Sequence, residues 1–204
     1  MEVLRNASEA EMVAEFLQGE IGSHRFREDI LRALAECGES EELITQSDCS
    51  DESANALRAR VLGVFRGYPD REIFENYPAD VDWKLVRFAE EDLGRLRYIS
   101  YSYWDELSKG TSRPDEAAKT VNEGVEIFGV SNRYFLEGRE LLLEGKHFPP
   151  IIVLTDGNGT CVLIEGHCRA TCYALVPGSF AGTEGYVGFC TTEELHRYNP
   201  ATAE

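Results

Sequence analysis

The stretch from Phe148 to Val176 constrains the fold most, because its hydrophobic pattern changes period within one continuous segment. Pro149 and Pro150 cannot lie inside a helix, so a new element must begin after them. The apolar, β-branched run 151–154 that follows predicts a short buried strand.

A second apolar run, 161–164, follows the turn sequence Asp156-Gly157-Asn158-Gly159. Gly and Asn accept positive φ, so this turn is typical of a β-hairpin. After Gly166 the residues 167–176 suit a short buried helix. The predicted unit is therefore strand, hairpin, strand, glycine and helix.

The junction at Gly166 predicts an anion site. The absent Cβ would allow a ligand to approach the backbone, and the first turn of a helix offers unpaired N–H groups at the positive end of its dipole. Phosphate is the commonest biological ligand of such a site. Arg169, His167 and Thr171 could donate further hydrogen bonds, and Glu165 lies beside them. The alternative is a plain strand-to-helix turn that these polar residues cap.

The sequence EGHCRATCYAL, preceded by FPPIIVL and followed by GYVGFC, resembles the ParB/sulfiredoxin superfamily. The resemblance covers residues 148–190 and extends toward Trp83. It implies an α+β core with a small mixed sheet, in which a glycine-initiated basic motif opens a helix and binds nucleotide phosphates.

The order Gly166-His167-Cys168-Arg169 distinguishes branches of this superfamily. Sulfiredoxins place their catalytic cysteine directly after the glycine, where this chain has His167, so sulfinic acid reduction is disfavoured. Chromosome-partitioning members have an acidic-basic-basic run after the glycine, whereas here Glu165 precedes it. The acid-Gly-His-x-Arg pattern is most similar to that of free-serine kinases.

This similarity implies ATP- or ADP-dependent phosphoryl transfer to a small molecule, by a kinase or a nucleotide hydrolase. Glu165 would act as base or Mg²⁺ ligand, and His167 would help to neutralise charge. One alternative is a non-catalytic nucleotide or phosphate sensor, and another is a DNA-binding or nuclease protein. The residues expected to bind nucleotide are Gly166, His167, Cys168, Arg169, Thr171 and Arg113.

The net charge of −17 bears on these alternatives. Residues 1–80 contain 18 acidic residues, 8 arginines and no lysine, a balance of −10. DNA binding normally depends on basic surface, so a nucleic-acid partner is not expected.

No apolar run has the length of a membrane span, no signal-peptide core follows Met1, and the six cysteines form no Cys-x-x-Cys pair. We therefore expect a cytoplasmic protein without a membrane partner.

Amphipathic patterns predict three helices near the N-terminus, at about residues 9–18, 26–37 and 53–65. We expect residues 1–80 to form a helical extension and residues 81–204 to form the ParB/sulfiredoxin-like domain. The extension would pack as a small bundle or present a surface to a partner protein.

The middle of the chain contains three further patterns. Tyr98, Tyr101, Tyr103 and Trp104 form an aromatic cluster that favours a core, with base stacking as the alternative. The polar residues before Pro114, which are Lys109, Thr111, Ser112 and Arg113, could form a second wall of the phosphate site. A helix is expected from Asn132 to Leu143, anchored by Leu136, Leu141, Leu142 and Leu143.

Overall fold

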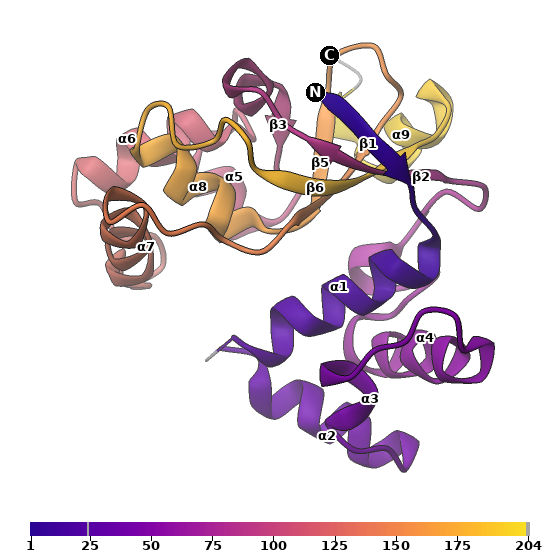
Figure 1. The fold of residues 1–204 in the computed structure, drawn as a ribbon. Helices are drawn as coiled ribbons and strands as arrows, with labels where there is room; N and C mark the ends of the chain where they lie inside the picture. The colour runs from indigo at the N-terminus through magenta and orange to yellow at the C-terminus, as the bar shows by residue number, and fades with distance from the viewer. Residues whose placement is uncertain (24, 203–204) are drawn as a thin grey trace.

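The computed structural model describes residues 1–23 and 25–202, which form a mixed α+β structure (Figure 1). The strands are β1 (Glu2–Asn6), β2 (Asp82–Arg87), β3 (Leu96–Arg97), β4 (Ile151–Thr155), β5 (Cys161–Glu165) and β6 (Glu184–Phe189). The helices are α1 (Glu9–Ile21), α2 (Arg27–Cys37), α3 (Glu42–Thr45), α4 (Glu52–Arg66), α5 (Ser102–Leu107), α6 (Pro114–Asn122), α7 (Arg133–Leu143), α8 (His167–Leu175) and α9 (Thr192–Tyr198). Short 3-10 helices are η1 (Glu72–Phe74), η2 (Glu90–Arg95) and η3 (Pro200–Thr202).

The strands form one six-stranded mixed sheet in the order β1-β2-β6-β4-β5-β3. The predicted hairpin is confirmed: β4 and β5 are antiparallel, with Thr155 opposite Cys161. The strand β6 lies parallel to β4, and β3 lies parallel to β5. The expected small mixed sheet is therefore present.

All five residues of β4 are buried, because helices cover both faces of the sheet. Ile151 and Val153 point to the side on which α6, α7 and α8 pack. Ile152 and Leu154 point to the opposite side, where helices from the first third of the chain complete the core. A strand buried on both faces has a continuous apolar sequence rather than an alternating one, as β4 does.

Helices α1–α4 form a helical lobe between β1 and β2 (Figure 1). All three long helices were expected, and the capping box of Ser8 with Glu11 and the Asp51 cap confirm two of their starts. The edge strand β1 was not expected, because its sequence EVLRN is mostly polar and largely exposed. Pairing with β2 stabilises it as a strand.

The helix α7 was expected, but only part of its expected apolar face is buried. Its buried residues are Phe135, Gly138 and Leu142, which lie one turn apart. A Cβ added at Gly138 would collide with Sγ of Cys172, so the glycine allows α7 to pack closely on α8. The three other expected anchors, Leu136, Leu141 and Leu143, are exposed.

The aromatic cluster is mainly core, as favoured by the sequence. Tyr98, Tyr103 and Trp104 are buried, whereas Tyr101 is 53% exposed. Tyr98 and Trp104 stack with ring centroids 4.8 Å apart. Among the described helices, none combines the length and the apolar character needed to span a membrane.

The contact at Gly138 predicts the effect of one substitution. Gly138→Ala should lower the free energy of unfolding by about 1–3 kcal/mol, because the new methyl group overpacks the α7–α8 interface. Urea denaturation would measure the change. The matched control is Gly94→Ala, where an added Cβ meets no atom within 4 Å; we expect a change of no more than about 0.5 kcal/mol. Equal effects of the two variants would contradict the packing role.

Candidate functional site

Gly166 links β5 to α8 in the left-handed conformation, with φ of 99°. A Cβ at this position would lie 2.6 Å from Cγ2 of Ile151. The glycine is thus required by its backbone angle and by its contact with β4. The sequence predicted that the missing Cβ would admit a ligand, but that space belongs to Ile151.

The start of α8 has no side-chain cap. Side chains cap the starts of α1, α4 and α9, whereas α2, α3, α5, α6 and α7 lack such a cap, as α8 does. The residues of the first turn of α8 are His167, Cys168 and Arg169, whose N–H groups have no acceptor one turn earlier within the helix. This end of α8 therefore retains a partial positive charge that can bind an anion.

The side chain of Arg169 is engaged within the protein. Its Nη1 donates to the carbonyl oxygens of Pro149 and Pro150, at 3.0 and 2.8 Å. Its Nη2 forms an ion pair with Oε2 of Glu165, and both side chains are largely buried. Arg169 therefore fixes the segment that precedes β4, and its guanidinium is not free to bind phosphate as the sequence predicted.

His167 lies against two aromatic rings of the core. Its ring stacks on Trp104 and Tyr98, with centroid separations of 5.2 and 5.7 Å. The residue as a whole is partly exposed, but its Nε2 atom is buried without a hydrogen-bond partner among the described residues. Burial, together with the nearby positive charge of Arg66, lowers the pKa of His167 to about 3. At neutral pH the imidazole is uncharged, so it can form a hydrogen bond but cannot neutralise a phosphate.

Cys168 and Thr171 differ sharply in accessibility. The Cys168 side chain is exposed at the surface, yet the protein around it desolvates the thiol and raises its pKa to about 11. A thiol with this pKa is protonated at neutral pH and is a weak nucleophile. Thr171 is fully buried, and its Oγ1 forms hydrogen bonds with the Tyr98 hydroxyl at 2.8 Å and the His167 carbonyl at 2.9 Å. Thr171 is therefore a structural residue of α8.

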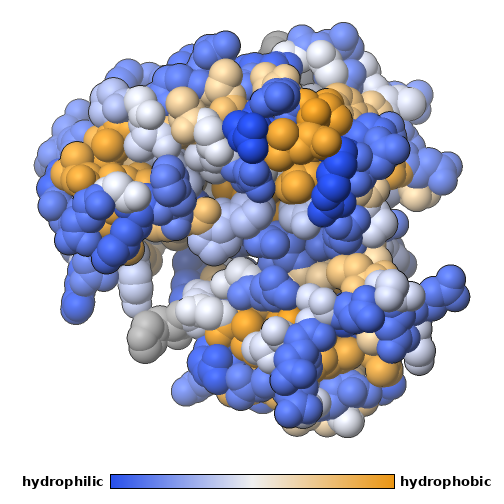
Figure 2. All heavy atoms as spheres, viewed as in Figure 1, coloured by the Kyte–Doolittle hydropathy of each residue, from blue (hydrophilic) through white to orange (hydrophobic). Residues whose placement is uncertain are grey.

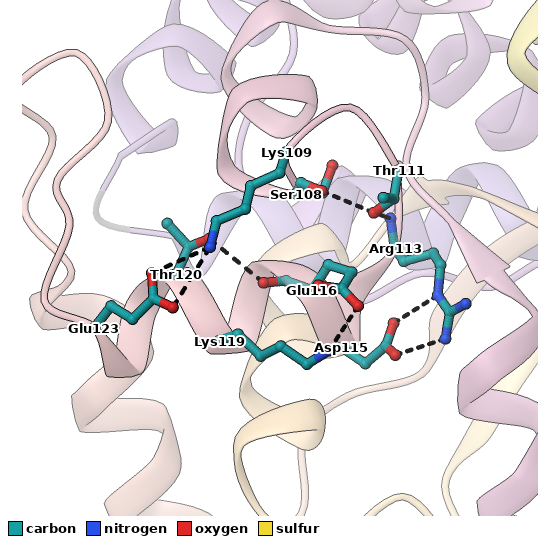
Figure 3. Close-up of polar contacts among 9 residues, drawn as sticks. All are labelled: Ser108, Lys109, Thr111, Arg113, Asp115, Glu116, Lys119, Thr120 and Glu123. Atoms are coloured by element: carbon teal, nitrogen blue, oxygen red, sulfur yellow. Dashed lines mark hydrogen bonds and ion pairs between the residues drawn. The ribbon is translucent and has the colours of Figure 1, made fainter.

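Arg113 precedes α6 and forms a bidentate ion pair with Asp115, at 2.9 and 2.6 Å (Figure 3). In the same segment Lys109 contacts Glu123 at 3.1 Å, and the Thr111 hydroxyl donates to the Ser108 carbonyl at 2.8 Å. These contacts complete the local structure around the start of α6. Three of the four side chains of the predicted second wall, those of Lys109, Thr111 and Arg113, thus already have partners.

The helical lobe contributes residues that the sequence did not indicate. A Cβ at Gly19 of α1 would lie 3.6 Å from Nη2 of Arg169, so α1 passes directly beside the Glu165–Arg169 pair. The next residue, Glu20, is buried and contacts Nη2 of Arg66 at 3.3 Å. The Nε atom of Arg66 is buried without a described partner. Figure 2 shows that the surface is hollowed between the helical lobe and the rest of the molecule.

The candidate site brings together Glu20, Arg66 and His167, which come from three distant segments of the chain. No spacing rule relates such positions, so sequence reasoning could not have found Glu20 and Arg66. Together with the uncapped start of α8, they form the candidate site.

Comparison of the chain with protein-family models, curated proteins and solved structures finds no match.

The Glu165–Arg169 ion pair predicts a loss of stability when it is broken. Arg169→Ala should lower the free energy of unfolding by about 3 kcal/mol, because it leaves Glu165 largely buried without its partner. Glu165→Gln should cost less, about 1–2 kcal/mol, since its amide oxygen still accepts from the guanidinium. Urea denaturation at pH 7 measures both. The control is Arg133→Ala, which breaks an exposed pair with Glu137 and should change stability by less than about 0.5 kcal/mol. An unchanged stability in Arg169→Ala would contradict the structural role.

The low pKa of His167 predicts a pH dependence. Between pH 6.5 and 5 the unfolded chain binds a proton that the folded chain does not, so folding stability falls as the pH falls. The slope approaches about 1.4 kcal/mol per pH unit, and the change over this window is about 1.6 kcal/mol because the unfolded imidazole is already half protonated at pH 6.5. The free energy of unfolding of wild type and of His167→Gln, measured as a function of pH, tests this. The variant should lose less stability than wild type between pH 6.5 and 5. The control His147→Gln changes an exposed histidine and should keep the slope; identical slopes in all three proteins would refute the prediction.

Proposed function

We propose that the chain binds the phosphate groups of a nucleotide at the start of α8 and acts as a nucleotide sensor. One observation carries this proposal: α8 begins without a side-chain cap, beside buried polar atoms of His167 and Arg66 that have no described partner. Unpaired N–H groups at the positive end of a helix bind anions, and a phosphate would supply the missing acceptors.

A ParB/sulfiredoxin-like core is part of this proposal. The order β4, hairpin, β5, Gly166 and α8 supports it, since that superfamily places its phosphate-binding glycine at the same junction. The nucleotide as the ligand comes from the resemblance of Gly166, His167 and Arg169 to the superfamily motif. Within the site, the N–H groups of His167 and Cys168 would contact phosphate, and Arg66 would approach from the helical lobe.

The ion pair between Glu165 and Arg169 favours binding without turnover. An adjacent guanidinium stabilises the charged carboxylate, which weakens it as a general base. The same guanidinium repels a divalent cation at short range. The residues present therefore fit Mg²⁺ poorly.

Phosphoryl transfer to a small molecule is the second proposal, supported by the presence of Glu165 in the acid-Gly-His-x-Arg pattern. Its test is the consumption of nucleotide in the presence of a pool of small hydroxyl metabolites. The enzyme proposal expects wild type to consume nucleotide. It expects Glu165→Gln to bind nucleotide but to consume it at least about a hundredfold more slowly. This result would show that the protein is an enzyme and would refute the sensor proposal. DNA binding or cleavage is disfavoured by the net charge of −17.

The sensor proposal predicts that ATP or ADP stabilises the fold. At 100 times its dissociation constant, the nucleotide should raise the free energy of unfolding by about 2.7 kcal/mol. Thermal melts with and without nucleotide measure this, each with Mg²⁺ and with a chelator. Cys168→Asp should abolish the stabilisation, because a carboxylate in the first turn of α8 competes with phosphate for the same N–H groups. Without ligand the helix dipole favours an acid here, whereas the surroundings that raise the pKa of the Cys168 thiol disfavour it, so melts without nucleotide must first show that the variant is folded.

The control is Ser131→Asp, which adds the same charge just before α7, a helix that also lacks a side-chain cap. It should leave the nucleotide effect unchanged. Absence of any shift with millimolar nucleotide in wild type would refute the proposal. Equal shifts in wild type and Cys168→Asp would place the ligand elsewhere.

A further inference from the structure

Most large hydrophobic side chains that are exposed among the described residues lie in one segment. Seven of the ten belong to residues 125–143: Val125, Phe128, Val130, Tyr134, Leu136, Leu141 and Leu143. Exposed apolar residues that occur singly need no explanation, whereas neighbouring ones mark an interaction surface. On α7, Leu136 and Leu143 share one flank of the helix and Tyr134 and Leu141 share the other. Figure 2 shows apolar surface among charged residues over α6 and α7.

A groove of about 470 Å³ lies within this segment, between the end of α6 and the outer side of α7. Val121 and Leu136 contribute its apolar lining, and Glu126, Glu137 and Glu140 contribute carboxylates. Leu136, Glu140 and Leu143 follow one another at helical spacing, so they form one flank of α7. The groove therefore combines an apolar floor with an acidic edge.

The turn that precedes α7 holds Phe128 in solvent. Phe128 is 69% exposed and has a φ of 51°, a left-handed conformation that bulky residues rarely adopt. The turn is held by the hydrogen bond from Val130 N to the Ile127 carbonyl at 2.9 Å, and Asn132 anchors it by donating to the Val125 carbonyl at 2.8 Å. Strained residues of this kind concentrate at binding sites. We name this turn together with the exposed flank of α7 the α7 surface.

The charge of the α7 surface distinguishes between its possible occupants. Three glutamates and Arg133 line the groove, so the lining keeps a net negative charge, although Glu137 is paired with Arg133 at 2.6 Å and Glu140 with Arg139, beside the groove, at 2.8 Å. A second copy of this chain, with its net charge of −17, would be repelled. An anionic membrane surface would be repelled for the same reason. A basic partner would be attracted.

We propose that the α7 surface binds a basic amphipathic helix of a partner protein. Such a helix would place its apolar stripe on Leu136, Leu143 and Phe128 and its lysines or arginines opposite Glu126 and Glu140, the usual mode of helix-in-groove recognition. The 11 residues of α7 span about 16 Å, which matches about three turns of a partner helix.

This proposal places the partner surface away from the N-terminal helices, for which the sequence left open either a packed bundle or a surface for a partner protein. The helices of the helical lobe bury their apolar faces in the core, and among their described residues Val64 is the one large hydrophobic side chain that is exposed. The proposal is independent of nucleotide binding.

Two synthetic helical peptides of about twelve residues test the proposal. They share one leucine stripe and carry either lysine or glutamate on the polar face. Fluorescence anisotropy should show that the lysine peptide binds wild type and that the glutamate peptide does not. Leu136→Ser and Phe128→Ser should each weaken the binding at least tenfold. The double variant Glu126→Lys with Glu140→Lys should reverse the preference between the peptides.

The matched control is Val64→Ser, because Val64 is 41% exposed and Leu136 is 38% exposed. It should bind the lysine peptide as wild type does, and thermal melts confirm that each variant is folded. Equal binding by wild type and Leu136→Ser would overturn the proposal, as would failure of both peptides to bind. Sedimentation that shows a dimer, dissociated by Leu136→Ser, would assign the surface to a second copy instead.

Discussion

Burial of β4 on both faces is the constraint on which the rest of the structure depends. Its side chains alternate between two cores, so each face of the sheet needs its own helical layer. Helices α6–α8 provide one layer and the helical lobe provides the other. Because both layers are anchored on the same strands, the start of α8 and the helices of the lobe lie within contact distance at the end of β5.

The Glu165–Arg169 pair determines what the candidate site can do. The sequence predicted that Arg169 would be exposed and bind phosphate. In the folded chain, Arg169 instead connects α8 to Glu165 of β5 and to the two prolines before β4. What is left for a ligand is mainly backbone: the uncapped N–H groups of α8, with His167 neutral and Arg66 approaching from another element. Sites of this kind recognise negative charge and shape more than they supply acid–base chemistry.

The sequence predicted the elements whose signals are local. The hairpin at Asp156–Gly159, the glycine before α8 and the caps at Ser8 and Asp51 all act within a few residues, and all are present. It did not predict β1, which is a strand because β2 lies beside it. Nor could it show that Arg169 and Thr171 have internal partners or that Arg66 lies near His167, because those contacts depend on tertiary packing. The exposed leucines of α7 were misjudged because Gly138, a weak hydrophobic signal, lies at the centre of the buried face.

The position of the helical lobe has a consequence for how the chain holds together. The lobe connects β1 to β2, two antiparallel neighbours that a short turn could join, so topologically it is a long insertion in a hairpin. Energetically it is no appendage, since its apolar residues cover Trp83, Ile152 and Ile164 on one side of the sheet. Melting the lobe would expose those strands to water. An insertion that serves as half of the core ties both parts of the chain into one cooperative folding unit.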